Sequence, residues 1–343
     1  MIAFIIYIGQ NGKRLTEEAQ IFAIFVAFFA GIVYNEIQLV YTKYKLAEKQ
    51  MEKITLKAMA KVNLGLDVIK RLENGYHQVK MIMQTINLYD VLTFEKAGQG
   101  ITLQIDDAYL PADESNLVWR AAALIKEHTP FDGVKISLKK RIPMAAGMAG
   151  GSTDAAAVFH GLNRLYDLGM DVERMQQLGV KLGADIPFCI AGGTMKSEGI
   201  GEILTPLPAP PAAFLVIAKP DISVSTKYVY ENLHVETISH HPNMDAVEQA
   251  IRNGDLDAMC YSMENILETV TEKKYSVIAQ IKAVLRAAGA QSALMSGSGP
   301  TVFGIFKDEE RAEAACAELA ESGLAKERFV TTFSQHTCME EGV

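Results

Sequence analysis

The chain contains Arg141-Ile-Pro-Met-Ala-Ala-Gly-Met-Ala-Gly-Gly-Ser-Thr-Asp-Ala-Ala-Ala-Val158, a loop of small residues that runs directly into an alanine-rich helix. The backbone carries no side chain at Gly147, Gly150 and Gly151, so several amide N–H groups can converge on one anion. The helix predicted from about Ser152 adds the positive end of its dipole. The segment therefore predicts a phosphate-binding loop, although it has neither the Walker A ending nor the dinucleotide-binding spacing. The alternative is an ordinary glycine-rich connection.

The composition is that of an ordinary globular protein. The 343 residues are 49% hydrophobic and 22% charged, and the formal net charge is −8. This length has room for two domains, and the negative charge argues against a nucleic-acid-binding surface. The four cysteines are far apart and have no spacing typical of zinc sites. We therefore expect reduced thiols, a cytoplasmic protein and no dedicated metal site.

Residues 1–50 differ from the rest of the chain in carrying an uncharged hydrophobic run from Ile21 to Tyr34. A membrane-spanning helix needs about 20 apolar residues, so this run is short for one. Three interpretations stay open: an upstream start that precedes a native start at Met51, a membrane-associating helix, or a helix packed on the protein. Membrane contact is expected only through residues 1–50.

Hydrophobic periodicity predicts a mixture of strands and helices. The predicted strands are 54–59, 62–69, 79–88, 91–94, 101–105, 134–138, 214–218, 293–295, 301–306 and 329–334. The predicted helices are 116–126, 153–166, 172–182, 226–232, 244–252, 261–267, 276–287 and 309–321. A proline cluster at 206–211 predicts a linker, which divides the chain after the extension into domains 51–208 and 209–343. The class is α+β, with an antiparallel sheet backed by helices in the second half.

Three further segments have residues suited to chemistry. Ala60-Lys-Val-Asn-Leu64 places Lys61 and Asn63 on the same face of a strand. Gly183-Ala-Asp-Ile-Pro187 has an aspartate between a glycine and a proline at a helix end. Ser296-Gly-Ser-Gly-Pro-Thr301 is a tight turn, which is either only a turn or a support for a substrate diphosphate.

In this order and at these separations, the three segments and the phosphate-binding loop resemble the GHMP kinase superfamily, from about Lys53 to the C-terminus. The resemblance implies a two-domain fold: an N-terminal mixed sheet with helices that carries the phosphate loop, and a C-terminal antiparallel sheet backed by helices. It also implies an ATP-dependent kinase that acts on a small molecule, with Mg²⁺ carried mainly by the ATP phosphates. We expect a monomer or a weak homodimer.

The segment Asn74-Gly-Tyr-His-Gln-Val79 is similar to one branch of the superfamily, which phosphorylates a cytidine-diphosphate-linked methylerythritol in non-mevalonate isoprenoid synthesis. The resemblance implies that Tyr76 stacks on the cytosine and that His77 hydrogen-bonds its edge. Tyr230 matches an aromatic residue on the other side of the base, and Thr226 precedes it in the same substrate-binding segment. The structural alternatives are an exposed aromatic at a hairpin tip for Tyr76 and a core tyrosine for Tyr230.

Phosphoryl transfer depends mostly on positioning and on charge stabilisation. Asp185 is expected to accept the proton of the attacking hydroxyl, as a general base does. Lys61 would favour the ionised form of Asp185 and stabilise developing negative charge, while Asn63 would orient the hydroxyl. The structural alternatives are a helix-capping aspartate and a solvated strand face.

The loop amides, together with two hydroxyls at the start of the helix, are expected to hold the ATP phosphates, and two more residues match positions that border the adenine. The predicted ATP-binding residues are Pro143, Met144, Ala145, Ala146, Gly147, Met148, Ala149, Gly150, Gly151, Ser152 and Thr153, with Asn116 and Lys140 at the adenine. The rival functions are a homoserine- or mevalonate-type kinase and a catalytically silent nucleotide sensor. The Gly-Tyr-His element argues against the first rival, and intact Lys61 and Asp185 argue against the second.

Overall fold

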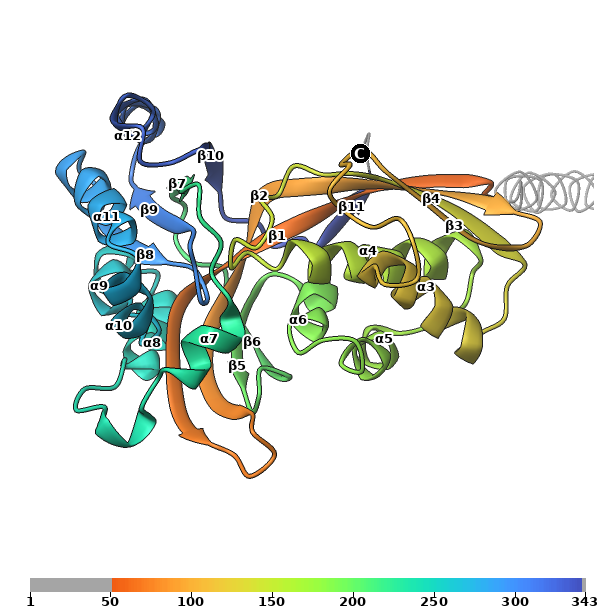
Figure 1. The fold of residues 1–343 in the computed structure, drawn as a ribbon, viewed down its shortest axis with the longest axis horizontal. Coiled ribbons are helices and arrows are strands. Elements are labelled where there is room, and N and C mark those ends of the chain that lie inside the picture. Colours follow the sequence, from red (N-terminus) through yellow and green to blue (C-terminus); the bar gives the residue numbers. More distant parts are fainter. Residues whose placement is uncertain (1–50, 341–343) are drawn as a thin grey trace, which may run out of the picture. The chain divides into compact units, whose positions relative to one another are not determined.

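Two long strands, β1 (Lys53–Arg71) and β2 (His77–Ala97), form an antiparallel hairpin (Figure 1). The computed structural model describes residues 51–340. The sequence predicts two short strands in place of each long one. The strands are continuous because bulges interrupt the side-chain alternation without ending the ladder. Two of these irregularities, between Met59 and Lys61 and between Asn63 and Gly65, lie on either side of Lys61 and Asn63.

The first sheet has the strand order β11-β1-β2-β4-β3, with β5 beside β2 and β6 beside β5. Strands β3 and β4 are parallel, and the other pairs are antiparallel. Helices cover one face of this sheet (Figure 1). The remaining elements of this part are β3 (Gly100–Ile105), α3 (Leu117–His128), β4 (Gly133–Lys139), α4 (Gly150–Leu165), α5 (Val172–Gly179), α6 (Ile186–Ala191), β5 (Thr194–Glu198), β6 (Ile203–Leu207) and β11 (Cys338–Glu340).

The second sheet is antiparallel throughout, with the order β10-β7-β9-β8, and helices pack beside it (Figure 1). The predicted α+β class is confirmed, with a mixed first sheet and an antiparallel second sheet backed by helices. Its elements are β7 (Phe214–Lys219), α7 (Thr226–Glu231), the 3-10 helix η1 (Val235–Thr237), α8 (Met244–Asn253), α9 (Leu256–Ser262), α10 (Glu268–Lys274), α11 (Val277–Ala287), β8 (Ser292–Met295), β9 (Val302–Phe306), α12 (Glu309–Ser322) and β10 (Glu327–Thr332).

The predicted helix over 261–267 is wrong. Helix α9 ends at Ser262, and the chain then runs beside β1, where Asn265 forms a parallel bridge with Leu66. A second difference is Pro206, which lies in β6 and not in a linker; β6 pairs only with β5, and an edge strand tolerates a proline. The sequence prediction also omits α6, which has Pro187 in its first turn, where a missing N–H costs nothing.

The predicted domain boundary at 208/209 falls between β6 of the first sheet and β7 of the second. It stays a prediction, because the described residues from Glu52 onward belong to one compact unit and β11 returns to the first sheet. Within residues 51–340, no helix combines the length and the apolar character that crossing a membrane requires. The hydrophobic run Ile21–Tyr34, and with it every interpretation of residues 1–50, lies outside the described residues.

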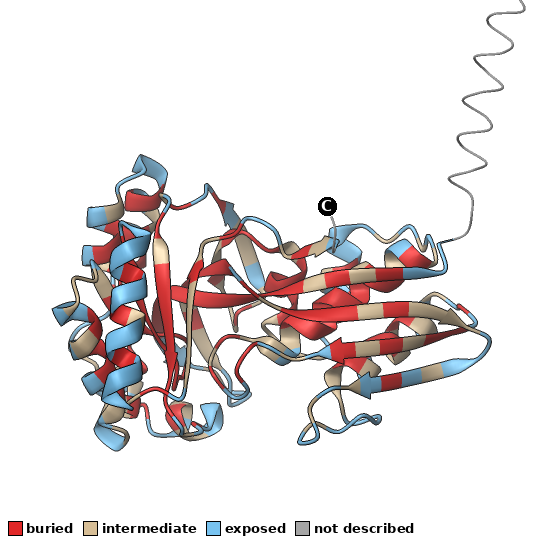
Figure 2. Cartoon of the chain, turned by 90° about the horizontal axis from the view of Figure 1, so that it is seen from above, coloured by how far each residue is buried: buried red, intermediate tan, exposed pale blue. Residues whose placement is uncertain are grey.

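The middle of β1 is buried almost continuously from Ala58 to Val68 (Figure 2). Such runs are typical of strands with both faces covered. Ala60, Val62 and Leu64 pack into a core that includes residues of β7 and α8. Since side chains alternate along a strand, Lys61 and Asn63 lie on the opposite face. Strand β1 therefore carries Lys61 and Asn63 where elements of the two sheets meet. Only 4% of the surface of Lys61 and 1% of that of Asn63 is exposed.

Helix α4 packs closely on β2 at Gly161, where an added Cβ would lie 2.5 Å from Cε2 of Phe94. We predict that Gly161→Ala lowers the free energy of unfolding by about 1–3 kcal/mol, because overpacking outweighs the gain in helix propensity. Urea denaturation of the full chain measures this. Gly98→Ala is the control, since no atom lies within 4 Å of its added Cβ. Equal changes in both variants would contradict the close packing.

Candidate active site

A cavity of 1210 Å³ opens between β1, the hairpin tip, the phosphate-binding loop, the start of α6, α7 and the Ser296–Pro300 turn. The structure brings nearly all of the predicted site residues to its walls. They are Lys61, Asn63, Tyr76, His77, Asn116, Lys140, Pro143, Met144, Ala145, Ala146, Gly147, Ala149, Gly150, Gly151, Ser152, Asp185, Thr226 and Tyr230.

Met148 and Thr153 are the predicted residues that do not line the cavity. The Met148 side chain is buried in the core, and the Thr153 hydroxyl donates a hydrogen bond to the backbone carbonyl of Met59. These contacts fasten the loop and the start of α4 to β1. The expected contact between the Thr153 hydroxyl and phosphate does not fit this geometry, whereas Ser152 lines the cavity.

The phosphate-binding loop has three residues in the left-handed region, Ala145 (φ 48°), Gly147 (φ 72°) and Ala149 (φ 58°). This conformation costs a residue with a Cβ roughly 1–2 kcal/mol, and such strain concentrates at functional sites. Ala149 is the N-cap of α4 and provides no side-chain hydrogen bond to it. The first amides of α4 therefore have no side-chain cap, in the arrangement that binds anions at helix N-termini.

Lys61 is held by two neutral oxygen atoms. Its Nζ donates to Oδ1 of Asn63 at 2.7 Å and to the carbonyl oxygen of Gly147 at 3.0 Å. The nearer carboxylate oxygen of Asp185, Oδ2, lies 4.0 Å from the same Nζ. The lysine is therefore fixed by its neighbours and still lies within ion-pair distance of Asp185.

Asp185 occupies the N-cap position of α6, yet its side chain makes no capping hydrogen bond to that helix. The alternative interpretation as a capping aspartate therefore does not apply. Its side chain is 38% exposed and lines the cavity opposite Lys61. A carboxylate with free oxygens, beside a fixed ammonium group, can accept a proton from a bound hydroxyl.

The hairpin tip and α7 place aromatic rings at the other end of the cavity. The rings of His77 and Tyr230 lie 5.1 Å apart at an interplanar angle of 39°. Tyr76 is 58% exposed beside them, in a turn where its N–H donates to Oδ1 of Asn74. Burial, and then the charge of Arg71, lowers the pKa of His77, so the ring is neutral at pH 7. Burial, and then Asp185, raises the pKa of the Tyr230 phenol.

Lys140 forms buried ion pairs with Asp90 and with Asp154, whose Oδ2 lies 2.7 Å from its Nζ. Oδ1 of Asp90 accepts the backbone N–H of Ile142 at 2.8 Å, which fixes the start of the phosphate-binding loop. Burial opposes the charge of Lys140, but the two carboxylates prevail and raise its pKa. Burial, and then Asp90, raises the pKa of Asp154. Lys140 is thus part of a charge cluster under the loop as well as of the cavity wall.

Asp90 and Asp154 are missing from the sequence prediction. They lie 50 and 14 residues from Lys140 in the chain, so no local motif connects them. Asp154 had one signal, because it is a charged residue among the alanines of α4. Other cavity residues that no motif indicated include Arg71, Leu110, Pro111, Ser115 and Glu231.

The Ser296–Pro300 turn closes the cavity on the side of α7. Gly297 and Ser298 line the cavity, and the Ser298 and Thr226 hydroxyl oxygens lie 2.8 Å apart. The hydroxyl of Ser296 donates to the carbonyl oxygen of Gly147 at 2.9 Å. The turn is therefore in contact with the phosphate-binding loop and with the predicted substrate-binding segment.

Sequence comparison finds the GHMP kinases N terminal domain at residues 116–193 and the GHMP kinases C terminal domain at residues 246–324. The 4-diphosphocytidyl-2-C-methyl-D-erythritol kinase of Lachnoclostridium phytofermentans is 50% identical over 285 residues, which cover 82% of this chain and 98% of the relative. The enzyme of the same name from Lachnospira eligens is 47% identical and is covered equally well.

Comparison with solved structures also finds kinases. A crystal structure of 4-(cytidine 5'-diphospho)-2C-methyl-D-erythritol kinase superposes with a TM-score of 0.71 at 33% identity, over 82% of this chain and 100% of that one. Homoserine kinase from Cytophaga hutchinsonii has a TM-score of 0.69 at 21% identity, over 84% and 97% of the two chains. The second similarity is one of fold alone.

The left-handed alanine at the start of α4 predicts a stabilising substitution. We expect Ala149→Gly to raise the free energy of unfolding by up to about 1 kcal/mol, because glycine adopts this conformation without a steric cost. Ala146→Gly, at a neighbouring buried position outside the left-handed region, should lower it instead. Chemical denaturation of both variants measures the difference. Destabilisation of similar size in both would be inconsistent with this loop conformation.

Proposed function

The chain belongs to the GHMP kinases, and we propose that it transfers the γ-phosphoryl group of ATP to the 2-hydroxyl of 4-(cytidine 5'-diphospho)-2-C-methyl-D-erythritol. This reaction belongs to non-mevalonate isoprenoid precursor synthesis. The observation that carries the proposal is the 50% identity with a kinase of that name over 98% of its length. The joint position of a phosphate-binding loop, the Lys61–Asp185 pair and the His77–Tyr230 rings on one cavity supports it.

In the proposed reaction Asp185 accepts the proton of the 2-hydroxyl as its oxygen attacks the γ-phosphorus. The new bond joins that oxygen to phosphorus, the bond between the γ-phosphorus and the β,γ-bridging oxygen breaks, and ADP leaves. Lys61 stabilises the negative charge that develops, and its two hydrogen bonds to neutral oxygens keep it in place without cancelling its charge. Asn63, whose Oδ1 is held by Lys61, orients the hydroxyl.

The open amides at the start of α4 and the Ser152 hydroxyl would hold the ATP phosphates. Mg²⁺ would be bound mainly by these phosphates. The oxygen donors of phosphate and of Ser152 suit this ion. When bound, it would neutralise charge on the transferring group. We propose that Asn116 borders the adenine; its side chain caps α3 at the cavity edge.

The cytosine would lie at the hairpin tip, between Tyr76 and the His77–Tyr230 pair. The His77 and Tyr230 rings, tilted by 39°, offer faces and edges against which a planar base can pack. The lowered pKa of His77 keeps its ring neutral, with one donor and one acceptor nitrogen for the base edge. A homoserine- or mevalonate-type kinase has no base to hold, so these rings favour the cytidyl substrate. We also propose a cytoplasmic location, which the four unpaired cysteines support.

The proposed substrate is tested by giving the purified full chain labelled ATP and, separately, the cytidyl alcohol, homoserine and mevalonate. We expect phosphorylation of the cytidyl alcohol alone. Transfer only to homoserine or mevalonate would show that the proposed specificity is wrong. Transfer to none of the three, with ATP binding intact, would favour a silent nucleotide sensor.

Asp185→Asn tests the general base. The variant should bind ATP as the native chain does, but its turnover should fall roughly 10²–10⁴-fold, because the amide cannot accept the proton. Steady-state turnover and equilibrium ATP binding are measured on the same preparation. Turnover within threefold of the native value would remove Asp185 from this role.

A further inference from the structure

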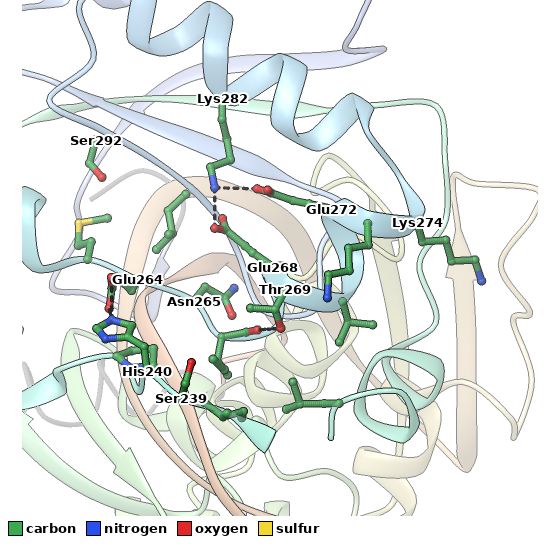
Figure 3. A pocket seen from close by; sticks show the side chains of 18 of the residues that line it. Ser239, His240, Glu264, Asn265, Glu268, Thr269, Glu272, Lys274, Lys282 and Ser292 are labelled. Atoms are coloured by element: carbon green, nitrogen blue, oxygen red, sulfur yellow. Dashed lines mark hydrogen bonds and ion pairs between the residues drawn. The ribbon is translucent and has the colours of Figure 1, made fainter. Parts of the chain in front are cut away.

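We propose that Asn265 and Glu268 are positioning residues, which act from outside the catalytic cavity by fixing the Ser296–Gly299 turn against the catalytic groups. The proposal rests on the proposed kinase function. Neither residue lines the catalytic cavity; both line a second cavity, of 1170 Å³ (Figure 3). Their effect on the reaction must therefore be indirect.

The Ser296–Gly299 turn lies where three parts of the site meet. A Cβ added at Gly297 would lie 3.2 Å from the carbonyl oxygen of Gly147 and 3.6 Å from Oδ1 of Asn63. The Ser296 hydroxyl donates to that same carbonyl oxygen, which also accepts from Lys61. A shift of the turn would therefore reach the catalytic strand and the phosphate-binding loop at once.

Asn265 holds the turn with both ends of its amide group. Its Nδ2 donates to the carbonyl oxygens of Met295 and Gly297, each at 2.8 Å, and its Oδ1 accepts the backbone N–H of Leu267 at 3.0 Å. The side chain is buried, so water cannot replace these bonds. Only a side chain with a donor and an acceptor on one short stem can make all three.

Glu268 holds the strand that leads into the turn. Its Oε1 accepts the backbone N–H of Met295 at 2.7 Å, and its Oε2 pairs with Lys282 at 2.5 Å. Figure 3 shows Lys282 pointing between Glu268 and Glu272, and its Nζ lies 2.7 Å from Oε1 of Glu272. Lys282 is itself buried, so this ion pair fixes the direction of the Glu268 carboxylate.

The segment that carries both residues is also tied to the catalytic strand. The N–H of Leu66 donates to the carbonyl oxygen of Glu264, and the N–H of Ile266 donates to that of Leu66, each at 3.0 Å. Leu66 is three residues beyond Asn63 on β1. The segment 264–268 therefore connects the Ser296–Gly299 turn to β1, which carries Lys61 and Asn63. It sets the distance between the turn and this strand.

Asn265→Asp tests this inference with the full chain. The carboxylate would face the carbonyl oxygens of Met295 and Gly297 without a proton to share, so the turn should move away. We expect kcat per folded molecule to fall roughly 10- to 100-fold, as misplacement of about 1 Å does. KM for the acceptor should stay within threefold, because Tyr76 and His77 lie at the hairpin tip and share no hydrogen bond with the turn, which meets α7 through the hydroxyls of Ser298 and Thr226. Asn243→Asp is the matched control, since only the oxygen of Asn243 is used, as acceptor from Ala246 N–H.

Glu268→Gln is the second variant, in case Asn265→Asp does not fold. The glutamine keeps an oxygen for the Met295 N–H but loses the charge that attracts Lys282. The Gly299 N–H donates to the carbonyl oxygen of Ser296 at 2.9 Å, and hydrogen exchange of this amide should become at least tenfold faster. Unchanged exchange, or kcat per folded molecule within twofold in both variants, would overturn the proposal. A purely structural role would lower the folded fraction without lowering kcat per folded molecule.

The two proposals fail in different ways. The native chain's acceptor panel decides the substrate, and kcat of the variants is measured with whichever acceptor the native chain phosphorylates. Hydrogen exchange needs no substrate at all. Loss of the cytidyl specificity would therefore leave the test of Asn265 and Glu268 intact.

Discussion

The carbonyl oxygen of Gly147 accepts hydrogen bonds from the Lys61 ammonium group and from the Ser296 hydroxyl, and the arrangement of the site depends on it. Through this one atom a β-strand, a loop and a turn, distant in sequence, come into contact. Only glycine fits here, because φ is 72° and an added Cβ would lie 2.1 Å from the carbonyl oxygen of Ser296. The missing side chain of Gly147 thus lets the loop contact the neighbouring turn as well as an anion.

The sequence was sufficient to predict that the loop at 141–152, Lys61 and Asn63, and the hairpin tip lie at one site, because each falls in a short segment of neighbouring residues. It was insufficient where partners are distant: Asp90 and Asp154 meet only in the fold, around Lys140. The error at 261–267 has the same cause. The local pattern there suits a helix, but pairing of Asn265 with Leu66 on β1 overrides it. The six-residue helix α6 is too short for a periodic signal.

Two buried charge clusters support the site from opposite sides. Lys140 lies between Asp90 and Asp154 next to the phosphate-binding loop. Lys282 lies between Glu268 and Glu272 next to the strand that leads into the Ser296–Gly299 turn. In each cluster a carboxylate also accepts a backbone N–H, of Ile142 or of Met295, at the entrance to a loop that lines the cavity. Buried ion pairs add little to stability when compared with well-packed apolar groups, but they define direction. Here the ion pairs orient the uncharged backbone N–H groups of Ile142 and Met295.

Strand β11 gives the protein a particular order of assembly during synthesis. Its residues Cys338 and Glu340 pair with Ala58 and Leu56 at the beginning of β1, so the first sheet is completed by one of the last described segments to leave the ribosome. Until then the β1 edge has unpaired N–H and C=O groups, which are a template for pairing with another chain. Contacts of such long sequence separation also form slowly. The edge of β1 therefore stays open to such pairing from the synthesis of β1 until that of β11.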